Sequence, residues 1–195
     1  LDPKTPYDDI LRHPLVTIAN KERVAEQDYI LVGERYKVDK SLDTTYPVVP
    51  LSDICEINAE NKNPALAFGD DEFIYIDISS VENGTGKIDF SNKIKGSNAP
   101  SRAKRAVKKG DILFSTVRPN LKAYGYVERE DFDCCVASTG FAVISAKNMV
   151  LSKYVYYMLY SEPVQAQLAS MMGKGAYPSV NQKDVSQIQI PLPPL

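Results

Sequence analysis

Short apolar runs bounded by turn residues recur along the chain from residue 47 onward. The clearest run spans residues 73–78, where β-branched and aromatic side chains predict a strand. Gly110 and Asp111 introduce a second predicted strand over Ile112–Ser115. Further short strands are predicted at residues 123–127, 134–137, 141–144 and 188–190, with a turn at 83–86 and a bend at 138–140.

Helical spacing appears late in the chain. Ser152 is a suitable N-cap for a helix over residues 153–160, and Pro163 fits the first turn of a helix that runs to about Met172. Gly173 and Gly175 are predicted to end that helix, and a helical turn is expected within residues 178–184. Strands followed by a late helical pair predict a mixed α/β (α+β) fold with a curved, mostly antiparallel sheet.

The first 46 residues differ in composition from the rest of the chain. They are polar and acidic, with weak helical patterns near residues 8–12 and 15–28, and the pattern changes at Tyr46-Pro47. We therefore expect an N-terminal connector or tail over residues 1–46 and one folded domain over residues 47–195. Because the sequence starts with Leu1 rather than Met, we expect it to be a piece of a longer protein.

Composition narrows the chemistry that this chain can perform. Its 195 residues contain one His, so a Ser–His–Asp arrangement, a Cys–His pair or a His-rich metal site would depend on His13 alone. The three cysteines, at positions 55, 134 and 135, fit buried reduced thiols better than a disulfide framework, which indicates a reducing, cytoplasmic compartment. The apolar runs are far shorter than the roughly 18 residues that a membrane span needs, so no membrane partner is expected.

Positive charge is concentrated in one segment, although the formal net charge is only −2. Residues 87–122 contain 10 basic and 2 acidic residues, a net charge of +8, whereas residues 1–86 have a net charge of −9. A run of this kind is commonly a solvated face of a helix or loop. It can also bind DNA phosphates, because clustered Lys and Arg release counterions. The densest part of the run contains Arg102, Lys104, Arg105, Lys108 and Lys109.

The residues that follow this run favour nucleic-acid recognition. Arg can bind the major-groove edge of guanine bidentately, and Asn can bind adenine in the same way. The segment supplies such hydrogen-bonding side chains at Ser115, Thr116, Arg118, Asn120 and Lys122.

Other candidate motifs lack the spacing that their chemistry requires. The acidic residues 70–72, and Asp77 with Glu82, are not followed by the ExK-type spacing of a metal-dependent nuclease, and no NPPY-type tetrapeptide for adenine methylation occurs. The Gly-Lys-Gly segment at 173–175 lacks P-loop spacing but can bring Lys174 close to a phosphate. The tyrosines at 154, 156, 157 and 160 form either a base-stacking platform or, as the helical spacing of Tyr154, Tyr157 and Met158 favours, part of the core. No catalytic or metal-binding residue is predicted.

Three segments, in order along the chain, resemble one protein family. KKGDILFSTVRPNLKAYGYV, residues 108–127, resembles the centre of a target recognition domain of Type I restriction–modification specificity subunits. VPLSDICEI, residues 49–57, is similar to the entry of that domain, and GKGAYPSVNQKDVSQIQIPLPPL, residues 173–195, is similar to its loop, short helix and exit. Residues 29–36 are similar to a connector found beside an N6-adenine methyltransferase, which implies a fused modification–specificity parent. The spacer helix and second recognition domain of the usual subunit are absent from this sequence.

The resemblance implies a DNA-reading module that has no catalytic residues and no cofactor of its own. Its implied partners are double-stranded DNA, an adenine-N6 methyltransferase (modification) subunit or domain that flips and methylates the base, and a restriction subunit. The basic run at 102–109 would bind phosphates, and two loops would approach the base edges of a half-site. The residues of those loops are Ser115, Thr116, Arg118, Asn120, Lys122, Lys174, Tyr177 and Ser179.

Two alternatives stay open from the sequence. One is a protein-interaction module that docks the methyltransferase through the acidic N-terminal third and the PLPPL exit. The other is an enzyme, either a nuclease or a self-sufficient methyltransferase. DNA binding that weakens steeply with salt would favour the recognition module, whereas metal-dependent cleavage or S-adenosylmethionine binding would favour the enzyme.

Overall fold

The computed structural model describes residues 21–26, 44–130, 132–172 and 178–194. The chain separates into two units, Leu1–Asp43 and Thr44–Leu195. In the first unit the described segment is helix α2 (Lys21–Glu26), which lies within the weak helical pattern at 15–28. The helix predicted at 8–12 and the connector-like segment at 29–36 lie outside the described residues.

One four-stranded sheet of the second unit is antiparallel throughout. Its strands are β2 (Cys55–Ile57), β9 (Phe141–Ala146), β6 (Ile112–Ser115) and β7 (Tyr124–Tyr126), in that order across the sheet. Side chains alternate between its faces. Ile112 and Phe114 pack in the core beneath the helices, whereas Leu113 packs in the core between the two sheets. Because both faces are covered, the whole of β6 is buried, which explains its continuous apolar sequence.

The second four-stranded sheet has the order β4 (Lys93–Lys95), β3 (Glu72–Ile76), β8 (Cys135–Ser138) and β5 (Ala103–Ala106). The β3–β8 pair is parallel, and its two neighbouring pairs are antiparallel. Ile74 and Ile76 face the core between the sheets, while Phe73 and Tyr75 face outward toward α4 (Pro64–Phe68). The rings of Phe68 and Phe73 stack at 5.1 Å, so α4 covers this outer face.

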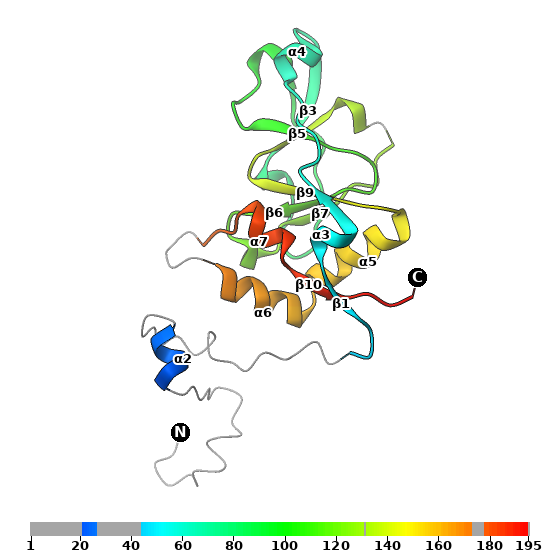
Figure 1. Cartoon of the computed structure of the whole chain (residues 1–195). Helices are drawn as coiled ribbons and strands as arrows, with labels where there is room; N and C mark the ends of the chain where they lie inside the picture. The colour runs from blue at the N-terminus through cyan, green and yellow to red at the C-terminus, as the bar shows by residue number, and fades with distance from the viewer. Residues whose placement is uncertain (1–20, 27–43, 131, 173–177, 195) are drawn as a thin grey trace. The chain divides into compact units, whose positions relative to one another are not determined.

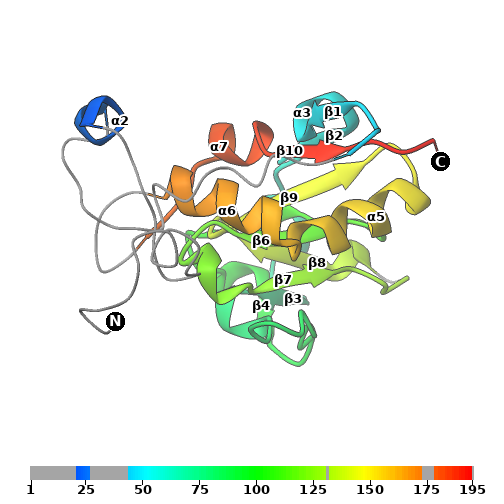
Figure 2. The same cartoon turned by 90° about the horizontal axis from the view of Figure 1, so that it is seen from below.

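Helices α5 (Met149–Leu159) and α6 (Glu162–Met171) cover the other face of the antiparallel sheet, opposite the second sheet and α4 (Figure 1). From below, both helices lie in front of that sheet (Figure 2). Two short helices, α3 (Leu51–Ile54) and α7 (Gln182–Ser186), pack in the same core. Strands β1 (Val48–Pro50) and β10 (Gln189–Pro191) form a two-stranded antiparallel sheet. The 3₁₀ helices among the described residues are η2 (Ile78–Ser80), η3 (Gly96–Asn98), η4 (Pro119–Leu121) and η5 (Phe132–Cys134).

The mixed α/β class, the mostly antiparallel strands and the late helical pair are confirmed, with three corrections. The strands divide between two stacked sheets and the small β1–β10 sheet, where one curved sheet was expected. Helix α5 begins at Met149 with Asn148 as its cap, and Ser152 lies inside the helix, where its hydroxyl donates to the Gly110 carbonyl. Tyr157 is 69% exposed, so it is not a core residue.

Candidate nucleic-acid interface

Loops from four distant parts of the chain meet at the end of β6 where Ser115 lies. We call this surface the loop face and define it as residues 101–102, 115–122, 139–140 and 178–180. Main-chain hydrogen bonds of 2.8–3.0 Å join the four segments. The N–H donors and their carbonyl acceptors are Thr139 to Arg102, Thr116 to Gly140, Val180 to Thr116, and Arg118 to Pro178.

The connection between β6 and β7 has a defined internal geometry. Arg118 (φ 49°) and Lys122 (φ 57°) are both left-handed and flank the single turn of η4. The Tyr124 hydroxyl donates to the Pro119 carbonyl at 2.6 Å, and Pro119 is buried. The adjoining Asn120 is exposed. The turn is therefore anchored on its inner side and presents residues 120 and 121 outward.

The predicted base-contacting residues differ in how exposed they are in the structure. Ser115 is fully buried, and its hydroxyl donates to the Val117 carbonyl at 2.7 Å, so it serves the turn. Thr116 is half-buried and donates to the Gly140 carbonyl at 2.8 Å. Arg118 and Lys122 are also half-buried, while Asn120 and Ser179 are exposed. Lys174 and Tyr177 lie outside the described residues.

The dense basic run is a strand and its flanking turns. Arg102 and Lys104 are exposed at the beginning of β5, and neither has an ion-pair partner among the described residues. Arg105 is half-buried, and its Nη1 donates to Asn61 Oδ1 at 3.0 Å. Burial lowers the pKa of Arg105 from its ordinary value because desolvation disfavours the charged form.

The remaining two basic residues of the run lie at the opposite end of β6 from the loop face. Lys108 Nζ is 3.3 Å from Glu60 Oε2, and Lys109 forms an ion pair with Glu130. The four residues of β6 alone extend about 13 Å, given a rise of about 3.3 Å per residue. The run thus contains two cations beside the loop face that form no ion pair with the described residues, a half-buried Arg105 bonded to Asn61, and two acid-paired lysines remote from the loop face.

Sequence reasoning missed several residues of the loop face, among them Val117, Leu121 and Thr139. Val117 and Leu121 are 40% and 44% exposed although they are apolar. Thr139 is exposed beside Arg102. Charge and hydrogen-bonding capacity selected the earlier candidates, so apolar positions gave no signal. The position of Thr139 depends on a contact between segments 37 residues apart, which no local pattern reveals.

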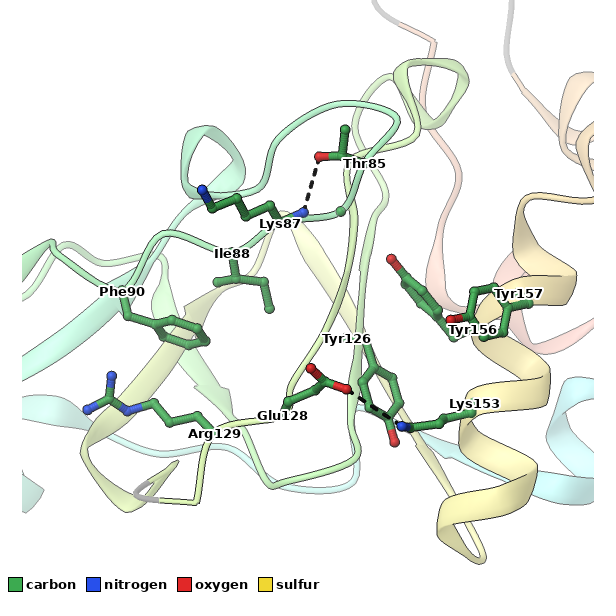
Figure 3. Close-up of a pocket in the computed structure, with 11 residues that line it drawn as sticks. Thr85, Lys87, Ile88, Phe90, Tyr126, Glu128, Arg129, Lys153, Tyr156 and Tyr157 are labelled. Atoms are coloured by element: carbon green, nitrogen blue, oxygen red, sulfur yellow. Dashed lines mark hydrogen bonds and ion pairs between the residues drawn. The ribbon is translucent and has the colours of Figure 1, made fainter.

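A pocket of about 370 Å³ follows the edge strand β7 (Figure 3). Tyr126 of β7 and Tyr156 of α5 lie on one side of it, and their ring centroids are 5.6 Å apart. Lys153 and Glu128 also line it, and Lys153 Nζ is 3.6 Å from Glu128 Oε1. The described residues that line the pocket therefore offer aromatic and charged surface, and none of them is a His, Cys or Ser that could form a nucleophilic pair. Among the described residues, no group of three or more His, Cys, Asp or Glu side chains is placed to hold a metal ion.

The PLPPL exit takes part in the fold. Pro191 belongs to β10, and the Leu192 N–H donates to the Pro47 carbonyl at 2.8 Å. This pairing explains the segment as an extended domain exit rather than a free proline-rich ligand. No helix in the described part of the chain is long and apolar enough to cross a membrane.

Comparisons with known proteins agree with this architecture. The HindI specificity subunit of a Type I restriction enzyme from Haemophilus influenzae is 30% identical over 125 residues, which cover 63% of this chain and 24% of that protein. The HsdS subunit crystal structure from Thermoanaerobacter tengcongensis matches with a TM-score of 0.66 and 34% identity. A structure describing complex assembly and conformational transition of the type I R-M system matches with a TM-score of 0.68 and 36% identity. Each structural match covers 79% of this chain and 39% of the other chain.

The family comparison covers the whole second unit. The family model of the Type I restriction modification DNA specificity domain matches residues 44–195. This result confirms the resemblance seen in the three motifs, and the two solved structures share the fold. The chain therefore belongs to the family of Type I restriction–modification DNA specificity domains.

Proposed function

We propose that this chain reads one half-site of a bipartite DNA sequence for a Type I-like restriction–modification system. Partner subunits or domains would then methylate adenine at N6 or restrict the DNA under its direction. The chain spans about a quarter of the curated relative and 39% of each solved chain, so it corresponds to one module of a larger specificity protein. In this proposal its partners are duplex DNA, the modification subunit or domain, and the restriction subunit.

The loop face is the observation that carries the proposal. Four segments converge there and place cationic and hydrogen-bonding side chains side by side on a buried sheet, which is the arrangement that base readout requires. Arg102 and Lys104 contact phosphates at its border. The side chains that approach base edges are Thr116, Arg118, Asn120, Lys122 and Ser179.

The other predicted phosphate contacts are more costly to form. Lys108 and Lys109 must exchange Glu60 and Glu130 for phosphate, and Arg105 must keep or exchange its hydrogen bond to Asn61. Exposed ion pairs of this kind contribute about 0–1 kcal/mol, so exchange is possible but gains less than binding by an unpaired cation. These three residues therefore hold a secondary part of the phosphate surface.

Selection of duplexes from a random library with the full chain tests the proposal directly. We expect a short consensus and binding that weakens steeply with salt, since released counterions supply much of the affinity. Arg118→Ala should cost about 1–3 kcal/mol and relax base preference at one position. Lys153→Ala, which removes an exposed cation of α5 away from the loop face, should change neither the affinity nor the base preference.

Two results would contradict DNA reading. The first is the absence of duplex binding at low salt. The second is capture of the modification subunit by a chain that binds no DNA of any sequence, which would support the docking role instead. Methylation mapping in the source genome supplies an independent readout, because the mapped site must contain the selected half-site.

A further inference from the structure

Two apolar side chains lie among the polar groups of the loop face. Val117 and Leu121 are 40% and 44% exposed and are separated by only three residues. Isolated exposed apolar residues are normal on protein surfaces. These two, however, share one short connection with Arg118 and Asn120, which the proposed function places against base edges. Burial of these two side chains in a complex would be favourable only against a group that is itself apolar.

Hydrogen bonds and a β-bridge fix the backbone at both residues, while their side chains stay exposed. The Ser115 hydroxyl donates to the Val117 carbonyl at 2.7 Å, and Val117 forms a β-bridge with Ser179. The Leu121 N–H donates to the Arg118 carbonyl at 2.9 Å, closing the turn of η4. The buried Pro119 occupies the inner side of this turn. The apolar surface is thus presented by a fixed turn between two buried strands.

One group in the major groove of DNA matches such a surface. The base edges there present hydrogen-bond donors and acceptors, and thymine adds the apolar C5-methyl group. An apolar side chain placed against a polar edge would strip water from it without replacing the hydrogen bonds, which is unfavourable. Against a methyl group the same side chain buries apolar surface on both partners. Asn120, adjoining Leu121, is of the type that binds the adenine of a T·A pair bidentately.

We propose that Val117 and Leu121 contact the C5-methyl group of a thymine in the recognised half-site. Asn120 would form hydrogen bonds with the adenine of the same T·A pair. This inference rests on the proposed function. It adds to that function one required T·A base pair and the three residues that contact it.

Deoxyuridine substitution tests the proposal because it removes only the methyl group of thymine and keeps base pairing intact. The full chain would first be used to select its duplex, and each thymine of the consensus would then be replaced by deoxyuridine in turn. At one position we expect affinity to fall about four-fold, the factor that corresponds to one methyl-sized apolar contact. Leu121→Ala should reduce affinity for the thymine duplex and reduce the difference between the two duplexes, because only Val117 would still contact the methyl group.

Matched variants separate this contact from general effects. Leu66→Ala, at an 85% exposed leucine of α4, should leave the deoxyuridine effect unchanged. Val117→Thr keeps the shape of the side chain but replaces one of its two methyl groups by a hydroxyl, and it should also reduce discrimination against deoxyuridine. Circular dichroism and thermal unfolding would establish that each variant is folded, and the wild-type comparison needs no variant at all.

The outcomes distinguish this inference from the proposed function. If no duplex is selected, DNA reading itself fails. If a duplex is selected but contains no thymine, or if no deoxyuridine substitution weakens wild-type binding, the thymine contact is overturned while DNA reading stands. A deoxyuridine effect that persists unchanged in both Leu121→Ala and Val117→Thr would likewise overturn the assignment.

Discussion

Asp111 is the residue on which the turn before β6 depends. Its Oδ2 accepts from the Lys108 N–H at 2.7 Å, and its Oδ1 accepts from the Ser145 hydroxyl at 2.7 Å. Gly110 supplies the left-handed backbone (φ 86°) that lets the chain reverse. Burial raises the pKa of Asp111 above its ordinary value of 3.8, because the charged carboxylate loses water and the hydrogen bonds compensate only in part.

We predict that Asp111→Asn flattens the dependence of stability on pH. A carboxyl whose pKa is higher in the folded than in the unfolded protein binds more protons when folded. Its contribution is therefore fully present below 3.8 and is lost as the pH rises through the raised folded value. Asparagine keeps an acceptor oxygen without ionising. Urea unfolding of both proteins from about pH 4 to about pH 7 measures the slopes, and parallel profiles would contradict the prediction.

Lys122 carries a backbone cost that glycine would remove. A left-handed conformation costs about 1–2 kcal/mol for a residue with a side chain, and glycine avoids this cost. Glycine also loses more chain entropy on folding, which offsets about 0.5–1 kcal/mol of the gain. We therefore expect Lys122→Gly to stabilise the fold by about 0.5–1 kcal/mol while it weakens DNA binding. Lys153→Gly, the same change inside α5, should instead destabilise by about 1 kcal/mol. Denaturant unfolding measures the stability of both variants. An equal loss of stability in the two would show that the left-handed backbone of Lys122 does not determine the effect.

At the scale of elements, burial on both faces made β6 predictable, while β5 escaped detection. Residues 112–114 are continuously apolar because each face of their sheet is covered. In contrast, β5 is the last strand of its sheet, and residues 60–62 cover its outer edge through main-chain hydrogen bonds. Its Lys104 and Arg105 resemble a solvated loop in the sequence. The start of α5 was predicted at the wrong residue because the sequence offers two possible caps. Asn148 and Ser152 are both good caps, and the contact of Ser152 with Gly110 exists only in the folded chain.

Tyr124 couples β7 to the turn of η4, and removal of its hydroxyl tests that coupling. Its ring stacks on Phe114 at 4.5 Å, and its hydroxyl donates to the Pro119 carbonyl. Burial raises the pKa of Tyr124 to about 12, so the hydroxyl keeps its proton at neutral pH. Tyr124→Phe should destabilise the fold by about 1 kcal/mol, because the carbonyl loses its donor, and should weaken sequence discrimination. Tyr157→Phe, at an exposed ring, should do neither in thermal unfolding and duplex-binding assays. An unchanged melting temperature in Tyr124→Phe would show that the turn is held by its backbone alone.

At the scale of the whole molecule, the motifs predicted the family and named two segments that the fold brings together. The family is confirmed over residues 44–195. The segment 115–122 and Ser179, separated by more than 50 residues in the chain, do meet through the contact of Val117 with Ser179. The layering into two sheets was not predictable, because it depends on pairings such as β2 with β9 and β1 with β10 between distant segments. Contacts between distant segments also divide the basic run at 102–109, which the sequence alone indicated to be one phosphate-binding surface.

The division of that run supplies a prediction with charge-matched variants. Arg102→Gln with Lys104→Gln removes two cations beside the loop face that have no ion-pair partner among the described residues, whereas Lys108→Gln with Lys109→Gln removes two that are paired with Glu60 and Glu130. Each lost phosphate contact lowers the slope of log affinity against log salt by about 0.9, so the first pair should reduce it by about 1–2. The second pair changes the net charge equally but should reduce the slope by less than half as much, because those cations are already compensated and lie at the far end of β6. Salt titrations of duplex binding compare the two proteins directly. Equal slopes would mean that DNA responds to the summed charge of the molecule, and that the loop face does not set the position of the duplex.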